Sequence, residues 1–232
     1  MLNKLIKELE NHQNKKQAGI LQGFFKTGKG EYGEGDIFLG VRVPIQRNIC
    51  KKYDLELKDI QELLNSRVHE HRLCGLFSLI SKYKNHRKLR KKIFDFYLKN
   101  TKKINNWDLV DLSAPNIIGD YLLDQGDRRI LYLLAKSKNL WEKRIAIIST
   151  YYFIKNNKFG ESLEISEILL KDKHDLIHKA VGWMLREIGK RDQKALENFL
   201  KKYYKKMPRT MLRYAVEKFP EGKRKAYLGR NI

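Results

Sequence analysis

The residues with the clearest potential for chemistry lie in the segment 106–113, where Trp107 and Asp111 are four positions apart. In a helix, which turns about 100° per residue, these two side chains would share one face, and Leu109 and Leu112 would point largely away from it. A fixed carboxylate and an aromatic ring both stabilise a nearby positive charge. The alternative interpretation is an exposed acid beside a core tryptophan, which describes most pairs with this spacing.

This segment belongs to a repeat with a period of about 36 residues. Equivalent helical segments are expected at 69–75, 141–147 and 177–183, and 105–111 fills the missing register. HEAT-like solenoids use two helices per unit of this length, and each pair buries its apolar face by stacking on the next pair. No sustained period-two alternation indicates strands. The sequence therefore predicts an all-α protein, an α-solenoid or superhelix of HEAT-like helical repeats.

The repeat register also assigns a surface position to Trp183, which is equivalent to Asp111. Trp183 lies about 140° from the centre of the core stripe of its helix on a helical wheel. That stripe consists of Ile177, Val181, Met184, Leu185 and Ile188. Trp183 and Asp111 should therefore project from the same surface. The alternative for Trp183 is a contact between neighbouring repeats.

The same surface should be basic. Lys143 and Lys179 occupy the positions equivalent to Trp107, and Arg144 lies about 60° from that position on the helical wheel. For Arg144 the alternative is a solvated charge or an ion pair. Small residues would let neighbouring helices of the repeats approach closely, namely Cys74, Ala146 and Gly182.

Composition narrows the classes of partner. The chain has 232 residues, 42% of them hydrophobic, so it can bury a substantial core. A net charge of +22 indicates a polyanion, and nucleic acid is favoured over a membrane because no apolar run approaches about 18 residues. Glu8 and Glu10 make the first helix unlike a signal sequence, which predicts a cytoplasmic protein. Cys50 and Cys74 are isolated and are expected to be core thiols.

A single HEAT-like repeat domain is predicted for residues 1–232, with a Gly-rich loop at about 26–40. Apolar spacing predicts helices at 2–9 and 20–25, Pro44 suits the first turn of a helix that ends near residue 53, and another begins at 57–64. Gly28, Gly30 and Gly33 spell GxGxxG, but a nucleotide-binding motif needs a strand before the glycines and a helix directly after. Here a helix precedes them. A loop that contacts phosphate through Lys26 or Lys29 is the better interpretation.

Two further patterns resemble functional motifs. His174 and His178 have the spacing of half a helical zinc site, but the glutamate base and an obvious third ligand are missing. A surface pair at a helix start is expected instead, and the sequence predicts no metal and no cofactor. The basic run 86–92 is interpreted as a helix face beside DNA or solvent.

Four segments together resemble the AlkD family of DNA alkylation-repair glycosylases, which has HEAT-like repeats. They are 38–44 (FLGVRVP), 107–111 (WDLVD), 141–146 (WEKRIA) and 179–187 (KAVGWMLRE). The resemblance covers nearly the whole chain. It implies that Trp107, Asp111, Arg144 and Trp183 are the functional residues.

The resemblance also implies a reaction, the hydrolysis of the N-glycosidic bond of cationic alkylated purines such as N7-methylguanine and N3-methyladenine. A cationic base departs as a neutral molecule without prior protonation, and positive charge develops on the deoxyribose. Asp111 would stabilise that charge and orient water, with the two tryptophans as aromatic faces. Asp108 is the rival acid, and the repeat register favours Asp111.

Double-stranded DNA containing alkylated bases is thus the expected partner of a monomer. Arg144 would hold a backbone phosphate, and Lys143, Lys179, Lys26 and Lys29 are the further DNA-binding candidates. The alternative function is a non-catalytic HEAT-repeat scaffold that binds nucleic acid or an acidic protein partner. Such a scaffold would not require a carboxylate within its basic face, because the carboxylate repels phosphate.

Overall fold

The computed structural model describes residues 1–229 and 231 and divides into two compact units, Met1–Leu109 and Val110–Ile232. Within the described residues there is no strand, and the only β-pairing is an isolated parallel bridge between Ile37 and Val68. The predicted all-α fold class is confirmed. The prediction of a single domain for residues 1–232 stays a prediction, because two compact units can belong to one continuous repeat domain. Each described helix is too short or too polar to cross a membrane.

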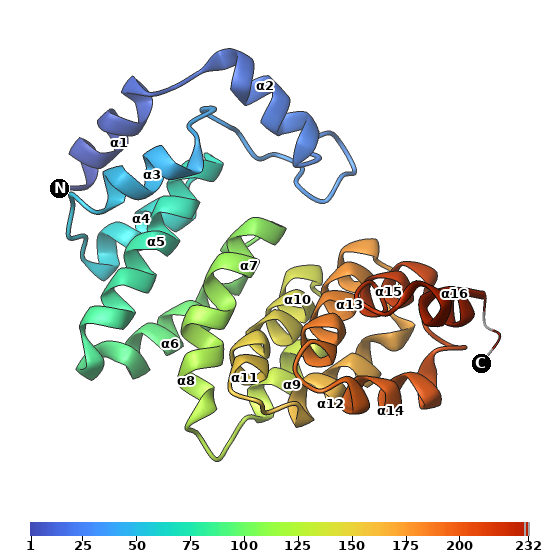
Figure 1. Cartoon of the computed structure of the whole chain (residues 1–232). Coiled ribbons are helices and arrows are strands. Elements are labelled where there is room, and N and C mark those ends of the chain that lie inside the picture. The colour runs from blue at the N-terminus through green and yellow to red at the C-terminus, as the bar shows by residue number, and fades with distance from the viewer. Residues whose placement is uncertain (230, 232) are drawn as a thin grey trace. The chain divides into compact units, whose positions relative to one another are not determined.

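The first unit is built from short helices (Figure 1), and the predicted helix at 20–25 begins earlier, at Lys15. They are α1 (Leu2–Asn11), α2 (Lys15–Phe24), α3 (Val43–Cys50), α4 (Leu57–Asn65), α5 (His69–Asn85) and α6 (Arg90–Lys99), with 3₁₀ turns at Arg87–Leu89 and Thr101–Lys103. The next helix, α7 (Trp107–Ala114), begins in this unit and contains the boundary between the two.

The core of the first unit gathers around α5, which is buried along most of its length and packs against α3 and α4. Gly75 allows this approach, because a Cβ there would lie 3.2 Å from Cβ of Leu63 on α4. A capping box between Glu56 and Asp59 fixes the start of α4, and Pro44 stands in the first turn of α3 as predicted. Cys50 and Cys74 are buried free thiols, as expected.

The Gly-rich loop connects α2 with α3 and is fastened to the start of α5 by Glu70. This buried carboxylate accepts hydrogen bonds from the backbone N–H groups of Leu39, Gly40 and Val41, at 3.0, 2.8 and 3.3 Å. Gly40 has φ of +82°, and a Cβ there would lie 2.2 Å from the carbonyl oxygen of Asn14. Only glycine fits this position. The end of the loop therefore has one fixed course into α3.

The glycines at the tip of this loop satisfy their amides internally. The N–H of Gly28 donates to Glu31 at 2.8 Å, and the N–H of Gly30 donates to Glu34 at 2.9 Å. A helix precedes the loop, and α3 begins ten residues after Gly33. The rejection of a nucleotide-binding motif is therefore supported, because these amides face carboxylates instead of phosphate.

The second unit continues with paired short helices. They are a π-helical turn (Pro115–Gly119), α8 (Asp120–Leu123), α9 (Arg129–Ala135), α10 (Leu140–Ser149), α11 (Tyr151–Lys155), α12 (Gly160–Ile168), a 3₁₀ turn (Leu169–Lys171), α13 (Asp175–Gly189), α14 (Gln193–Tyr203), α15 (Arg209–Ala215) and α16 (Glu221–Gly229). Pro115 has no N–H to continue the helical ladder, which accounts for the π-turn after α7.

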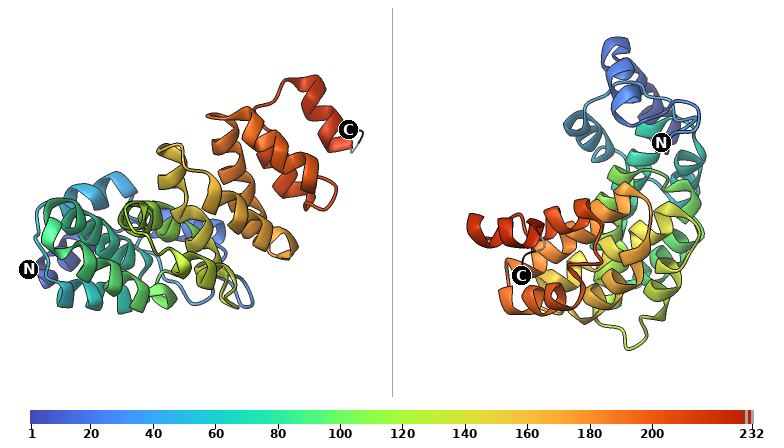
Figure 2. Two further views of the ribbon diagram at one scale, coloured as in Figure 1. Left: turned by 90° about the horizontal axis from the view of Figure 1, so that it is seen from below. Right: turned by 90° about the vertical axis from the view of Figure 1, so that its right-hand side faces the viewer.

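Within this unit α13 packs against α10 on one side and α15 on the other (Figures 1 and 2). Gly182 lets α13 and α15 approach, because a Cβ there would lie 2.5 Å from both the Met211 carbonyl oxygen and Cβ of Tyr214. The prediction for Gly182 is thus confirmed. Helices α5, α7, α10 and α13 begin at 69, 107, 140 and 175, close to the predicted period.

Candidate functional site

Asp111 on α7 and Arg144 on α10 form a two-point ion pair in the second unit. Nε of Arg144 donates to Oδ1 of Asp111 at 2.8 Å, and Nη2 donates to Oδ2 at 2.7 Å. Nη1 donates to the carbonyl oxygen of Leu176, in the first turn of α13, at 2.6 Å. The Arg144 side chain is 6% exposed, whereas that of Asp111 is 19% exposed. The arginine therefore anchors a carboxylate that solvent still reaches.

This geometry confirms one of the two alternatives for Arg144, the ion pair. Planar guanidinium–carboxylate pairs fix orientation as well as charge, because two parallel N–H···O bonds form at once. Three of the five N–H groups of Arg144 are used within the protein. A contact between Arg144 and a backbone phosphate stays a prediction, and the contacts seen here assign it a supporting position behind Asp111.

Trp183 lies off the buried stripe of α13, as predicted, and is partly exposed. Its ring is tilted by 40° against that of Tyr151 on α11, with ring centroids 5.7 Å apart. The ammonium group of Lys155 lies 4.7 Å from the centroid of Tyr151. Tyr151 was not predicted as a site residue, because it lies outside the repeat register.

The two lysines predicted on the basic face are engaged with acids of the same unit. Lys143 pairs with Asp172, and Lys179 pairs with Asp175 at 2.7 Å. The side chain of Lys143 is largely buried, so an acid neutralises the predicted basic face around Asp111 at this position. Asp172, in the link before α13, and Asp175, in the first turn of α13, neutralise these two lysines. DNA contacts of both lysines stay predictions.

The histidine pair belongs to the start of α13, as expected. Nδ1 of His174 accepts the backbone N–H of Leu176 at 3.1 Å and caps the helix, and Nε2 of His178 lies 2.6 Å from the Asp172 carbonyl oxygen. Within the part of the chain that the structure describes, no three His, Cys, Asp or Glu side chains are grouped so that they could hold a metal ion.

Trp107, in the first unit, lies in an aromatic cluster. Its ring stacks on Phe25 at 5.1 Å between centroids and 15° between planes, and Phe24 meets it edge-on at 5.9 Å. Phe25 in turn stacks on Phe38 at 5.1 Å. Each such pair contributes about 0.5–1.5 kcal/mol beyond its buried area. The cluster joins the end of α2 and the Gly-rich loop to the first residue of α7.

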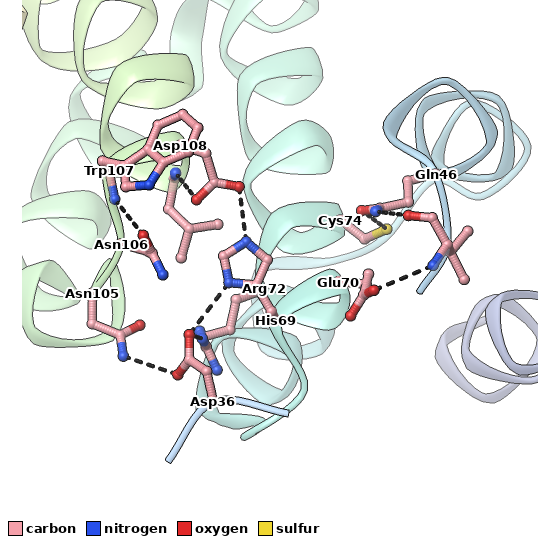
Figure 3. A network of polar contacts seen from close by, with 12 residues as sticks. Asp36, Gln46, His69, Glu70, Arg72, Cys74, Asn105, Asn106, Trp107 and Asp108 are labelled. Atoms are coloured by element: carbon pink, nitrogen blue, oxygen red, sulfur yellow. Dashed lines mark hydrogen bonds and ion pairs between the residues drawn. The ribbon is translucent and has the colours of Figure 1, made fainter. Parts of the chain in front are cut away.

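Next to Trp107, Asp108 is engaged with a buried histidine (Figure 3). Nε2 of His69 lies 2.8 Å from Oδ2 of Asp108, and Nδ1 lies 3.3 Å from Oδ2 of Asp36. Oδ1 of Asp108 accepts the backbone N–H of Leu109 at 2.8 Å. Burial alone would lower the pKa of His69, but the charge and hydrogen bond of Asp108, with the hydrogen bond to Asp36, raise the pKa to about 9.

Asp36 is the centre of this network, which Figure 3 shows from close by. Arg72 donates to its Oδ2 at 2.5 Å, and Nδ2 of Asn105 lies 3.2 Å from its Oδ1. Burial alone would raise the pKa of Asp36, but the hydrogen bond with His69 and the charge of Arg72 lower it. Two carboxylates and two cations thus balance one another. Sequence reasoning missed His69 and Asp36, because neither lies in the repeat positions that carry the candidates.

The candidates in the Gly-rich loop are exposed. Lys26 lies 3.9 Å from Glu31, and Lys29 is at the tip of the loop. A hollow of about 300 Å³ beside the loop is lined by four basic side chains, namely Arg67, Arg72, Lys102 and Lys103. Arg72 is paired with Asp36, which leaves Arg67, Lys102 and Lys103 as additional candidates for phosphate contacts. Lys102 and Lys103 could have been noticed as a basic pair shortly before Trp107.

Comparison with known proteins agrees with this architecture. No curated protein matches the chain. A solved structure described as a predicted DNA alkylation repair enzyme from Enterococcus faecalis is similar in fold, with a TM-score of 0.69 at 15% identity, over 90% of this chain and 98% of that one. The profile of the family described as DNA alkylation repair enzyme matches residues 5–219. The chain therefore belongs to the DNA alkylation repair enzyme family.

Proposed function

We propose that this protein is a DNA glycosylase that hydrolyses the N-glycosidic bond of cationic alkylated purines in duplex DNA. Membership of the family supports a role in DNA alkylation repair. The observation that carries the finer proposal is the Asp111 carboxylate, partly exposed and held at both oxygens by the buried Arg144.

The reaction requires little of the protein when the base is already cationic. As the C1′–N bond of N7-methylguanine breaks, its electron pair neutralises the base and positive charge moves to the sugar. Asp111 stabilises that charge. Because Asp111 is partly exposed and a carboxylate can accept about four hydrogen bonds, it can also orient the water that adds to C1′. The products are the neutral base, an abasic site and a proton.

Contacts of the neighbouring acid support the assignment of Asp111 instead of Asp108. Asp108 holds His69 with one oxygen and its own helix start with the other. A carboxylate that neutralises a buried histidine in this way would lose that partner if it turned toward a substrate. Asp111 can keep its two hydrogen bonds with Arg144 while it faces a substrate, because its side chain is the more exposed of the pair.

Trp107 and Trp183 supply aromatic faces for the sugar and the developing cation in this proposal. Such an interaction contributes roughly 0.5–2 kcal/mol, depending on how far water is excluded. Each indole is held by an aromatic neighbour, Trp107 by Phe25 and Trp183 by Tyr151.

The DNA backbone is the proposed ligand of the basic side chains. The net charge of +22 favours duplex binding, and the hollow with Arg67, Lys102 and Lys103 adds a candidate phosphate contact to Lys26 and Lys29 of the loop. We propose action as a monomer in the cytoplasm.

The test is incubation with a duplex that contains one N7-methylguanine, followed by measurement of free base and of abasic sites. Equal amounts of both products are expected from the wild type, and Asp111→Asn should release both at least about 100-fold more slowly. If the wild-type protein binds the duplex but releases no base, a non-catalytic scaffold is the better account.

A further inference from the structure

His69 contacts a carboxylate with each of its two ring nitrogens. Nε2 lies 2.8 Å from Asp108 and Nδ1 lies 3.3 Å from Asp36, and the side chain is 2% exposed. A neutral imidazole has only one N–H, so it can donate to only one of these two acceptors. Only the imidazolium form donates to both. The geometry of the two contacts, which Figure 3 shows, therefore indicates a buried cation between two anions.

This cation joins segments that are far apart in the sequence. Asp36 belongs to the Gly-rich loop, His69 opens α5, and Asp108 is the second residue of α7, directly after Trp107. Oδ1 of Asp108 also accepts the N–H of Leu109, so the carboxylate fixes the first turn of α7. The backbone that carries Trp107 is thereby tied to α5.

The ring of Trp107 is connected to the same histidine through a series of aromatic contacts. Trp107 stacks on Phe25, Phe25 stacks on Phe38, and Phe38 stacks on the imidazole of His69 at 4.6 Å and 21°. Phe25 also meets His69 directly at 5.0 Å. A change at His69 thus reaches the indole by two routes, through Asp108 and the backbone, and through the stacked rings.

We propose that His69, held as a cation between Asp36 and Asp108, is a positioning residue that sets the orientation of the Trp107 indole. This inference rests on the proposed function in one respect, namely that Trp107 contacts the substrate. The claim that His69 orients the Trp107 indole concerns the protein without DNA, so it can be tested separately.

The proposal makes the indole orientation dependent on pH. The ionisable groups that face His69 are Asp108 from α7, Asp36 from the loop and Arg72 from its own helix. The two carboxylates favour the charged imidazole, whereas the arginine opposes it. Loss of the proton near pH 9 leaves one N–H for two carboxylates, so the unprotonated ring nitrogen then faces a carboxylate without a hydrogen bond. The imidazole should shift between Asp36 and Asp108, and the rings stacked on it and the start of α7 should shift with it.

The first test uses ¹⁹F NMR of the protein labelled with 5-fluorotryptophan. Trp107, Trp141 and Trp183 give three signals, which Trp→Phe variants assign. The Trp107 signal should shift between pH 7 and 10 with a midpoint near 9 in the wild type. It should not titrate in His69→Gln, while the other two signals serve as internal references. Asp108→Asn keeps the side-chain volume and serves as the second variant if His69→Gln does not fold. In Asp108→Asn the midpoint of the Trp107 titration should fall, because the charge that favours the imidazolium is removed.

The matched control is His71→Gln. His71 lies two residues further along α5 and contacts Ser66 at 3.0 Å instead of the network. The Trp107 signal of the His71→Gln variant should titrate as in the wild type. A Trp107 signal that does not respond to pH in the wild type, or that titrates unchanged in both His69→Gln and Asp108→Asn, would overturn the proposal.

The second test measures single-turnover excision of N7-methylguanine at pH 7.5. Misplacement of a catalytic group by about 1 Å can cost about 100-fold, so His69→Gln and Asp108→Asn should lose roughly 10-fold to 100-fold in rate. Affinity for unmodified duplex should be retained, and His71→Gln should match the wild type in both. Equal losses in His69→Gln and His71→Gln would contradict a positioning role. If the wild type releases no base, the proposed function fails, and the NMR result still decides whether His69 orients Trp107.

Discussion

Arg144 and Asp111 meet through two parallel hydrogen bonds of 2.8 and 2.7 Å, and the arginine is the more buried partner. Burial of the cation behind a partly exposed carboxylate distinguishes this pair from a surface ion pair, which typically contributes little to stability. It also separates two possible roles for Arg144, that of holding Asp111 and that of holding a phosphate.

Substitution of Arg144 tests which role applies. Arg144→Lys keeps the charge but cannot form the two-point contact, so excision should fall about 10-fold to 100-fold with little change in duplex affinity. The measurements are single-turnover rates and binding titrations at several salt concentrations. If Arg144→Ala instead lowers affinity and reduces the slope of log K against log salt by about one unit, Arg144 contacts a phosphate.

Binding of undamaged duplex should weaken steeply with salt. Each neutralised phosphate contributes a slope of about −0.9, so Lys102→Ala with Lys103→Ala should reduce the slope by about two units. The matched control is Lys4→Ala with Lys7→Ala on α1, which removes the same charge from exposed positions. Fluorescence anisotropy at salt concentrations from about 50 to about 200 mM provides the slopes. Equal reductions in both double variants would indicate diffuse attraction and no phosphate contact at the hollow.

Stability should decrease at alkaline pH because of His69. Its pKa is raised from 6.5 to about 9, so its contribution is fully present below pH 6.5 and is lost as the pH rises through 9. The shift corresponds to on the order of 3 kcal/mol. Urea unfolding at pH 6.5 and pH 10 should show this loss in the wild type and a smaller one in His69→Gln. The same pH dependence in both proteins would assign the loss to other groups.

Packing between α13 and α15 should not tolerate a side chain at position 182. A methyl group there would lie 2.5 Å from two atoms of α15, so Gly182→Ala should destabilise the second unit by about 1–3 kcal/mol. Gly222→Ala on α16 is the control, because a Cβ at that position would have no neighbouring atom within 4 Å, and alanine there should be neutral or stabilising. Thermal unfolding measures both. A tolerated Gly182→Ala would show that α13 and α15 can separate.

The helical repeats could be predicted because their signal is local and periodic. The stripe from Ile177 to Ile188 left Trp183 outside the core, and the structure places it there. Pairs of polar side chains could not be predicted in this way, because their members are distant in the sequence. Arg144 reaches an acid 33 positions away, and His69 reaches Asp36 at the same separation. Such pairs depend on how helices and loops pack, which one sequence does not specify.

The lysines illustrate the same limit. Lys143 and Lys179 were placed on the correct helices, but the sequence did not indicate that Asp172 and Asp175 would pair with them. Charge pattern predicts the sign of a surface more reliably than the availability of any one side chain. The aromatic cluster at Trp107 was not predicted for a related reason, since apolar spacing indicates a helix at 20–25 but not that Phe24 and Phe25 contact the first residue of α7.

The most direct test of the central claim is single-turnover excision from matched duplexes that contain either cationic N7-methylguanine or neutral hypoxanthine. With Asp111 as the only acting carboxylate and no acid at the equivalent positions Gly75, Ile147 and Trp183, the cationic base should be released and the neutral base should be released at least about 100-fold more slowly. Asp111→Asn should lower the rate on N7-methylguanine by about 10² to 10³ with the fold and duplex affinity retained, and Asp108→Asn should be milder. Comparable rates on both lesions, or a greater loss in Asp108→Asn than in Asp111→Asn, would contradict the one-carboxylate mechanism.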